Sequence, residues 1–215
     1  NGTTENTLIE ADHVYVDSDG SLRMVSDKKE QVTLDRMDGS RELHLRNGRV
    51  DYLAADISHE KARLDKLASE TFTDPARLER FNKLRQNFDT EAFDRNLSIN
   101  TRALTYKQIN RLLADNPSAV LSRGDRADLA EQMLSHSSDL RSIDQGANST
   151  CNVTTLENRN YARNPDKNVQ IVADIAESGK FVTLSGQTVD MARLQAGIKP
   201  DGEATINLQL QRSGG

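Results

Sequence analysis

The residue in this chain best suited to covalent chemistry is its single cysteine, Cys151. It follows Ser149 and Thr150, two residue types that cap helix N-termini, and the segment after it predicts a helix through Leu156 and Tyr161. A thiol in the first turn of a helix faces unpaired backbone N–H groups and the positive end of the helix dipole. Both effects favour the thiolate, so the sequence predicts that Cys151 is a nucleophile.

A second polar residue, Gln145, lies six positions upstream of the cysteine and carries a side-chain amide that can donate hydrogen bonds. If the loop between them folds back beside the sulfur, this amide lies where negative charge develops on an attacked carbonyl oxygen. Gly146 gives that loop the freedom to turn. We therefore expect the Gln145 amide to lie within about one water molecule of Cys151.

The pattern Asp144-Gln145-Gly146, four residues and then Cys151 resembles the active-site segment of the papain-like cysteine peptidases. In that family a Gln-Gly pair precedes the cysteine that opens the central helix. The resemblance implies that Cys151 is the nucleophile and that Gln145 donates to the oxyanion. It also implies a peptide or protein substrate, and neither a cofactor nor a metal ion. The segment departs from the family at Asn152, where the family has tryptophan.

The catalytic histidine of that family follows the cysteine, whereas no histidine follows His136 in this sequence. Amide cleavage requires a proton donor for the leaving amine as well as an activated sulfur. We therefore expect the 215 residues to be inactive alone. A C-terminal fragment or domain beyond Gly215 would supply the histidine, and residues 57–140 stand where the pro-region of a zymogen, or a spacer, would lie.

A second enzymatic interpretation uses the permuted order of the ubiquitin-like-protein proteases and adenovirus-type proteases, in which histidine and aspartate precede a Gln-x5-Cys end. His44 precedes the Asn47-Gly48 turn and Asp51 follows it. The two side chains would pair if the register of the hairpin allowed it.

A third interpretation is non-catalytic. The chain would then be a structural or interaction region of a large secreted or surface protein, with Cys151 in a structural role. Only 35% of the residues are hydrophobic and 4% are aromatic, so we expect a modest, mostly aliphatic core and partly autonomous substructures.

The charge distribution limits the partners. The net charge is −5, and residues 1–56 hold 7 basic and 12 acidic side chains, so the excess of acid lies at the N-terminal end. No segment is basic enough to predict a nucleic-acid partner. No run of about eighteen apolar residues occurs, so the sequence predicts no membrane span.

Glycosylation sequons bear on the source of the protein. Two of the four Asn-x-Ser/Thr sites bracket Cys151, and glycans there would block a catalytic thiol. A catalytic role therefore favours a bacterial source. The chain begins with Asn1, which is consistent with removal of a leader from an exported or secreted protein. The sequons lie at Asn1, Asn96, Asn148 and Asn152.

The predicted fold class is α+β in three parts. Residues 1–56 predict an antiparallel β-meander, in which three turn signals, Asp17-Ser18-Asp19-Gly20, Asp38-Gly39 and Asn47-Gly48, join four short strands. Residues 57–140 predict a helical segment. Residues 141–215 predict an α+β segment that carries the nucleophile, and the papain resemblance implies that it is like the helical half of that fold.

Helix boundaries are predicted from capping residues. Ser58 begins a helix through Glu70, and Asp74-Pro75 begins the next. Thr105 with Gln108 predicts a capping box, residues 123–135 predict another helix, and Asn164-Pro165 predicts a helix that stops at Gly179. A hairpin over Ser185-Gly186 is expected to follow, and then a strand over residues 204–210.

Overall fold

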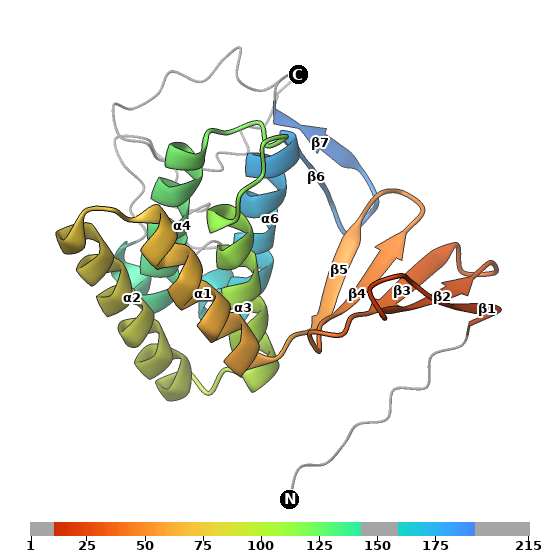
Figure 1. Ribbon diagram of the computed structural model, residues 1–215, viewed down its shortest axis with the longest axis horizontal. Helices are drawn as coiled ribbons and strands as arrows, with labels where there is room; N and C mark the ends of the chain where they lie inside the picture. Colours follow the sequence, from red (N-terminus) through yellow and green to blue (C-terminus); the bar gives the residue numbers. More distant parts are fainter. Residues whose placement is uncertain (1–10, 143–158, 192–215) are drawn as a thin grey trace, which may run out of the picture. The chain divides into compact units, whose positions relative to one another are not determined.

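The computed structural model describes residues 11–142 and 159–191 (Figure 1). The chain divides into two compact units. The sheet unit contains the described residues up to Asp56 together with Val182–Gln187, and the helical unit contains Ile57–Phe181 and the described residues from Thr188. The predicted α+β class is confirmed, with the large sheet at the N-terminal end.

An antiparallel meander forms the sheet unit, in the strand order β1-β2-β3-β4-β5. The predicted meander is confirmed, but the prediction of four strands is wrong because the sheet has five. The sequence signals missed the turn between β2 and β3, which contains no glycine. The strands are β1 (His13–Val16), β2 (Leu22–Ser26), β3 (Gln31–Asp35), β4 (Arg41–Leu45) and β5 (Val50–Ala54).

Successive strands of the meander are joined by one repeated four-residue turn. In each turn the backbone N–H of the fourth residue donates to the carbonyl of the first, and the fourth residue has a positive φ. Glycine occupies this position in three turns because it tolerates positive φ. In the missed turn Glu30 occupies it, with φ of 48°. The fourth residues are Gly20, Glu30, Gly39 and Gly48.

The described part of the sheet unit buries polar side chains only. Apolar residues of β1 remain exposed instead, and ion pairs across the strands, such as Arg41 with Asp35 at 2.7 Å, support the ladder. The sheet unit is therefore a single layer whose stability depends on backbone pairing more than on apolar burial. Its buried side chains are Ser21, Ser26, Thr33, Ser40 and Glu42.

Helix α3 is the central element of the helical unit, and it packs against α1, α4 and α6 (Figure 1). Residues 159–163 are also helical, and a hairpin of β6 (Lys180–Val182) and β7 (Thr188–Asp190) follows α6. No helix among the described residues has a stretch long and apolar enough to cross a bilayer. The helices are α1 (Ile57–Thr71), α2 (Pro75–Asp94), α3 (Ile99–Leu113), α4 (Arg123–Ser138), the short 3-10 helix η1 (Leu140–Ser142) and α6 (Pro165–Ser178).

The described core of the helical unit is mostly aliphatic, as predicted, and five of its twenty buried residues are aromatic. Phe72 contacts Phe81 with 4.8 Å between ring centroids, and Phe88 meets Tyr106 edge to face at 5.3 Å. Most of the few aromatic residues in the chain are concentrated here, where each buries a large area. Leucine, valine and alanine side chains of α3, α4 and α6 complete this core.

The capping predictions have mixed outcomes. Asp74 caps α2 and accepts a hydrogen bond from the Ala76 N–H, as predicted. The capping box at Thr105 is wrong, because Ser98 caps α3 and Thr105 lies buried inside that helix. The Pro165 start of α6 is confirmed, but the Asn164 side chain makes no capping bond.

Candidate functional site

The predicted catalytic residues Cys151 and Gln145 lie outside the described residues, within the segment 143–158. The predicted cap at Ser149 and Thr150 lies there too. The contact between the Gln145 amide and the thiol therefore stays a prediction. The described residues on either side of this segment show where the chain enters and leaves it.

On the N-terminal side, the chain leaves the end of α4 through a tight turn. The Asp139 N–H donates to the Ser135 carbonyl at 2.8 Å, and the Asp139 carbonyl accepts from the Ser142 N–H at 2.9 Å. The Asp139 carboxylate accepts from the Arg141 backbone and guanidinium, and these bonds lower its pKa. The last described residue before the gap, Ser142, is thus fixed to the end of α4.

On the C-terminal side, Tyr161 fixes the chain to the same helix. Its ring is 1% exposed, and its hydroxyl donates to the Met133 sulfur at 2.9 Å. Arg95, at the end of α2, donates to the Tyr161 carbonyl at 3.2 Å and also to the Ser137 carbonyl. Both described flanks of the segment that carries Cys151 are therefore held at the C-terminal end of α4.

His136 lies at this end of α4, packed edge to face on Tyr161 with 5.6 Å between ring centroids. Its Nδ1 atom is buried and has no hydrogen-bond partner among the described residues. Burial lowers the pKa of His136 to about 4. The imidazole is therefore neutral near pH 7, and so low a pKa makes it a weak base for the proton of a thiol.

The sheet-unit histidines bear on the permuted interpretation, whose expected pairing is wrong. His44 lies opposite Val50 in the ladder, whereas Asp51 lies opposite Leu43 and so points to the other face of the sheet. His44 instead contacts Glu42 at 3.0 Å, and Asp51 accepts from the Arg49 guanidinium. No His-Asp pair of the expected kind forms at this hairpin.

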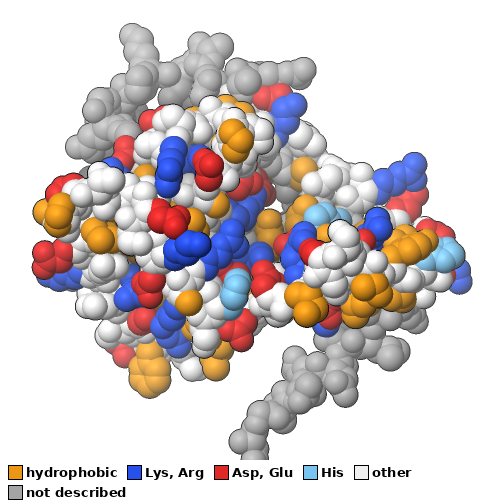
Figure 2. Space-filling view, viewed as in Figure 1, with side chains coloured by type: hydrophobic (Ala, Val, Ile, Leu, Met, Phe, Trp, Pro, Cys, Tyr) orange, Lys and Arg blue, Asp and Glu red, His pale blue; other side chains and the backbone are white. Residues whose placement is uncertain are grey.

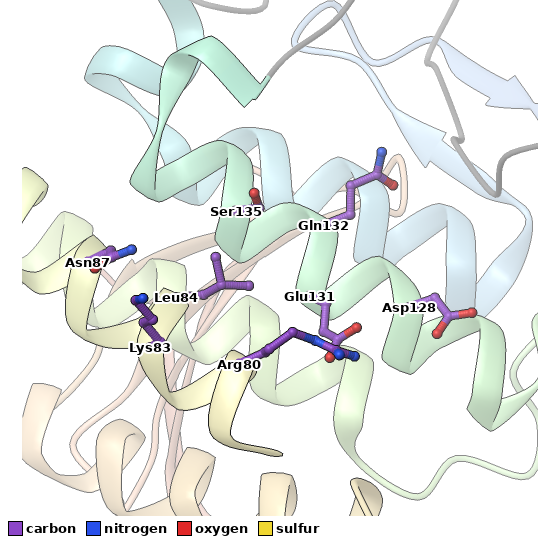
Figure 3. A pocket seen from close by; sticks show the side chains of 8 residues that line it. All are labelled: Arg80, Lys83, Leu84, Asn87, Asp128, Glu131, Gln132 and Ser135. Atoms are coloured by element: carbon purple, nitrogen blue, oxygen red, sulfur yellow. The ribbon is translucent and has the colours of Figure 1, made fainter. Parts of the chain in front are cut away.

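A groove of about 530 Å³ lies between α2 and α4 (Figure 3), and the sequence analysis did not predict it. Positively charged Arg80 and Lys83 line it from α2, and negatively charged Asp128 and Glu131 line it from α4. Beside it, Arg77 donates to Asp128 and Glu131, and its hydrogen bond to Glu131 raises the pKa of Arg77. The described residues that line it are Arg80, Lys83, Leu84, Asn87, Asp128, Glu131, Gln132 and Ser135.

The groove suits binding more than covalent chemistry. Leu84 is the one apolar side chain among the described residues that line it, and Asn87 and Gln132 offer amides of the kind that hydrogen-bond a peptide backbone. The Gln132 Oε1 atom is buried and has no partner. The sequence did contain a pattern that indicates this groove, because the lining residues recur at helical spacing on each helix and are nearly all polar.

Comparisons with known proteins do not assign the chain to a family, because no protein-family model, no curated protein and no solved structure matches it. The likeness to papain-like peptidases therefore rests on the segment from Asp144 to Cys151.

Proposed function

We propose that this chain carries the nucleophile half of a papain-like cysteine peptidase or a related thiol acyl-transfer enzyme. Cys151 is the nucleophile and Gln145 donates to the oxyanion. The spacing Asp144-Gln145-Gly146-x4-Cys151 carries the proposal, since it combines a thiol at a predicted helix start with an amide donor and a flexible residue.

In this reaction the Cys151 thiolate attacks a substrate carbonyl carbon, and the carbonyl electron pair moves to oxygen. The Gln145 amide donates a hydrogen bond to that oxyanion. When the oxyanion collapses, the amine leaves with a proton from an imidazolium and an acyl-thioester remains on Cys151. Water then hydrolyses the thioester and regenerates the thiol.

The described residues support this proposal in two ways. Ser142 and Tyr161 are both fixed to α4, and a rigid support on both sides suits a site that needs exact positioning of its groups. The groove between α2 and α4 includes Ser135, one turn before the end of α4, and offers amides and charges to a peptide chain.

The proton donor comes from outside these residues in this proposal. His136 is neutral near pH 7 because burial lowers its pKa to about 4. His13 and His44 belong to the sheet unit, where they pair with Asp27 and Glu42. None of the four histidines of the sequence follows Cys151, as the catalytic histidine does in the papain-like peptidases, so we assign this histidine to a C-terminal fragment or domain of the full protein.

Labelling the intact natural protein with a thiol-directed epoxide tests the nucleophile. Cys151 is the one cysteine of these 215 residues, and the adduct that Cys151→Ser abolishes reports on this site. A paired thiolate is expected to react at least tenfold faster than the same protein in denaturant at equal pH. Equal rates in the two states would refute an activated thiol.

Turnover of a peptide substrate by the same protein tests the oxyanion donor. Gln145→Ala should lower kcat roughly a hundredfold and leave the labelling of Cys151 intact. Gln86→Ala, the same change at an exposed position of α2, is the matched control and should leave kcat unchanged. Unchanged kcat in Gln145→Ala would remove Gln145 from the proposal.

The non-catalytic alternative has one specific observation in its favour. The sheet unit buries only polar side chains among its described residues and exposes Val14 and Val16, which suits an interaction module better than an enzyme scaffold. In that case Cys151 should react with the epoxide no faster than in denaturant, and the intact protein should show no thiol-dependent turnover.

A further inference from the structure

Among the described residues, strand β1 is an edge of the sheet with no covering segment that would block pairing with another strand. All four of its residues are exposed, and Val14 and Val16 keep 61% and 71% of their surface in solvent. Natural sheets protect their edges with lysine, proline, bulges or covering segments. The sequence from Asp12 to Ser18 contains no lysine, arginine or proline. Figure 2 shows hydrophobic side chains gathered over β1 and β2 of the sheet unit.

The backbone pairing shows which groups of β1 face outward. The Asp17 N–H donates to the Ser21 carbonyl at 2.8 Å, so these two residues form a hydrogen-bonded pair. Because such pairs alternate along an antiparallel ladder, Tyr15 is hydrogen-bonded to Arg23 while Val14 and Val16 are not bonded to β2. The N–H and C=O groups of Val14 and Val16 therefore point away from the sheet, toward an edge where no described strand pairs with them.

The opposite edge of the sheet unit, at β5, has a neighbouring segment. Residues 182–187, which form the tip of the β6–β7 hairpin, belong to the same unit. The Arg49 guanidinium, just before β5, donates to the Leu184 carbonyl at 3.2 Å. A neighbouring hairpin thus accompanies the β5 side, whereas no described segment lies along the outer side of β1. Arg23 of β2 stacks on the Tyr15 ring at 5.3 Å.

We propose that β1 is a self-association site, where β1 of a second copy of this chain pairs with it antiparallel and joins the two meanders into one sheet. In this arrangement Tyr15 lies opposite the second copy's Tyr15. Val14 lies opposite the second copy's Val16, and their outward N–H and C=O groups bond to each other. The proposal is independent of any chemistry at Cys151.

Self-complementarity of the strand favours a second copy as the occupant. In the proposed register His13 lies opposite the second copy's Asp17, on the same face as the paired tyrosines, while the valines meet on the other face. A shift by two residues along the strand would set Asp12 against Val16 or Asp17 against Tyr15. The pairing of apolar with apolar residues thus favours the proposed register, because His13 and Asp17 already pair with Asp27 and Arg23 within one copy.

The contact is small, so the association is weak. Stable interfaces bury about 1,600 Å² in total, and a strand of four residues buries far less than this. We expect a dissociation constant on the order of 100 μM, which sedimentation at protein concentrations up to about 1 mM can measure.

Cross-linking across the proposed two-fold axis tests the register. In a Cys151→Ser background, Tyr15→Cys places two thiols in a non-hydrogen-bonded antiparallel pair, where Cα atoms about 4.5 Å apart lie within disulfide reach. Met37→Cys in the same background is the control, because Met37 is 77% exposed at a turn of the same sheet. Mild oxidation should link Tyr15→Cys into dimers at least tenfold faster than Met37→Cys. Equal rates would overturn the register.

A proline variant tests the backbone pairing. Val14→Pro removes only an outward N–H and leaves every β1–β2 hydrogen bond in place, because Val14 donates no bond to β2. It should retain the circular dichroism of the parent and raise the dissociation constant at least tenfold. A parent protein that stays monomeric at about 1 mM, or a folded Val14→Pro that associates like the parent, would overturn the proposal.

Discussion

His136 should make the helical unit sensitive to mild acid. Its imidazole packs against Tyr161, its Nδ1 has no partner in the described part of the chain, and burial lowers its pKa to about 4 from the ordinary value of 6.5. The unfolded chain therefore binds a proton below about pH 6.5, whereas the folded chain binds it only near pH 4. The stabilisation is complete above the unfolded pKa and is lost as the pH falls toward the folded pKa.

The size of the effect follows from the two pKa values of His136. A difference from 6.5 to about 4, at about 1.4 kcal/mol for each pH unit, gives a total of roughly 3 kcal/mol. At pH 5 the unfolded chain is almost fully protonated at this imidazole and the folded chain is mostly not. The free energy of unfolding should therefore fall by about 2 kcal/mol between pH 7.5 and pH 5 because of His136 alone.

Urea unfolding followed by circular dichroism at 222 nm measures this loss, since the helical unit contributes most of that signal. Carboxylates also titrate in acid, so the informative quantity is the difference between the parent and His136→Phe, which keeps an aromatic ring against Tyr161. The parent should lose about 2 kcal/mol more than His136→Phe between pH 7.5 and pH 5. His59→Gln, at an exposed position of α1, is the matched control and should behave like the parent. Equal losses in the parent and in His136→Phe would refute the reasoning.

Two further predictions concern buried polar groups of the helical unit. Arg126 is 2% exposed and donates to two backbone carbonyls at the end of α3, so Arg126→Met should lower the free energy of unfolding by about 3 kcal/mol in urea titrations. A loss below about 1 kcal/mol would show that these bonds contribute little. Asn110 donates to the Glu60 carbonyl at 2.9 Å and to its carboxylate at 2.7 Å, and Asn110→Ala should cost about 2 to 4 kcal/mol. If the two groups act together, Asn110→Ala with Glu60→Gln should cost less than the sum of the single changes, and additive losses would contradict this.

The meander shows which turns can be predicted from local residue types. Asp-Gly and Asn-Gly pairs located three of the four turns because the last residue of each has positive φ, which glycine adopts without strain. Glu30 adopts the same conformation without being glycine, so residue type gave no signal there. The spacing of the strands did indicate this turn, because the strands begin at regular intervals, at residues 13, 22, 31, 41 and 50.

Helix α3 shows where local patterns fail. Periodicity predicts a helix from an apolar stripe, but α3 is enclosed by neighbours on several sides and buries Thr105, Lys107 and Asn110 along with its apolar residues. The partner of Lys107 and Asn110 is Glu60, on a different helix. The sequence pattern of Thr105 and Gln108 predicted a capping box, although both residues are buried inside α3. Partners that satisfy buried polar residues can lie far away along the chain, so a local pattern does not reveal them.

The same division between local and distant information applies to the candidate site. A thiol, its predicted helix start and a glutamine amide are contiguous in sequence, so the resemblance could be found from the segment Asp144 to Cys151 alone. A proton donor is a tertiary property, because it depends on which histidine the fold brings near and on whether that histidine is charged. His136 stands closest in sequence to Cys151, yet burial keeps it neutral at neutral pH. An imidazole with so low a pKa is a weak base for the thiol proton, so little of the imidazolium that the leaving amine needs would form, and for this reason the proposed enzyme uses a histidine from outside these residues.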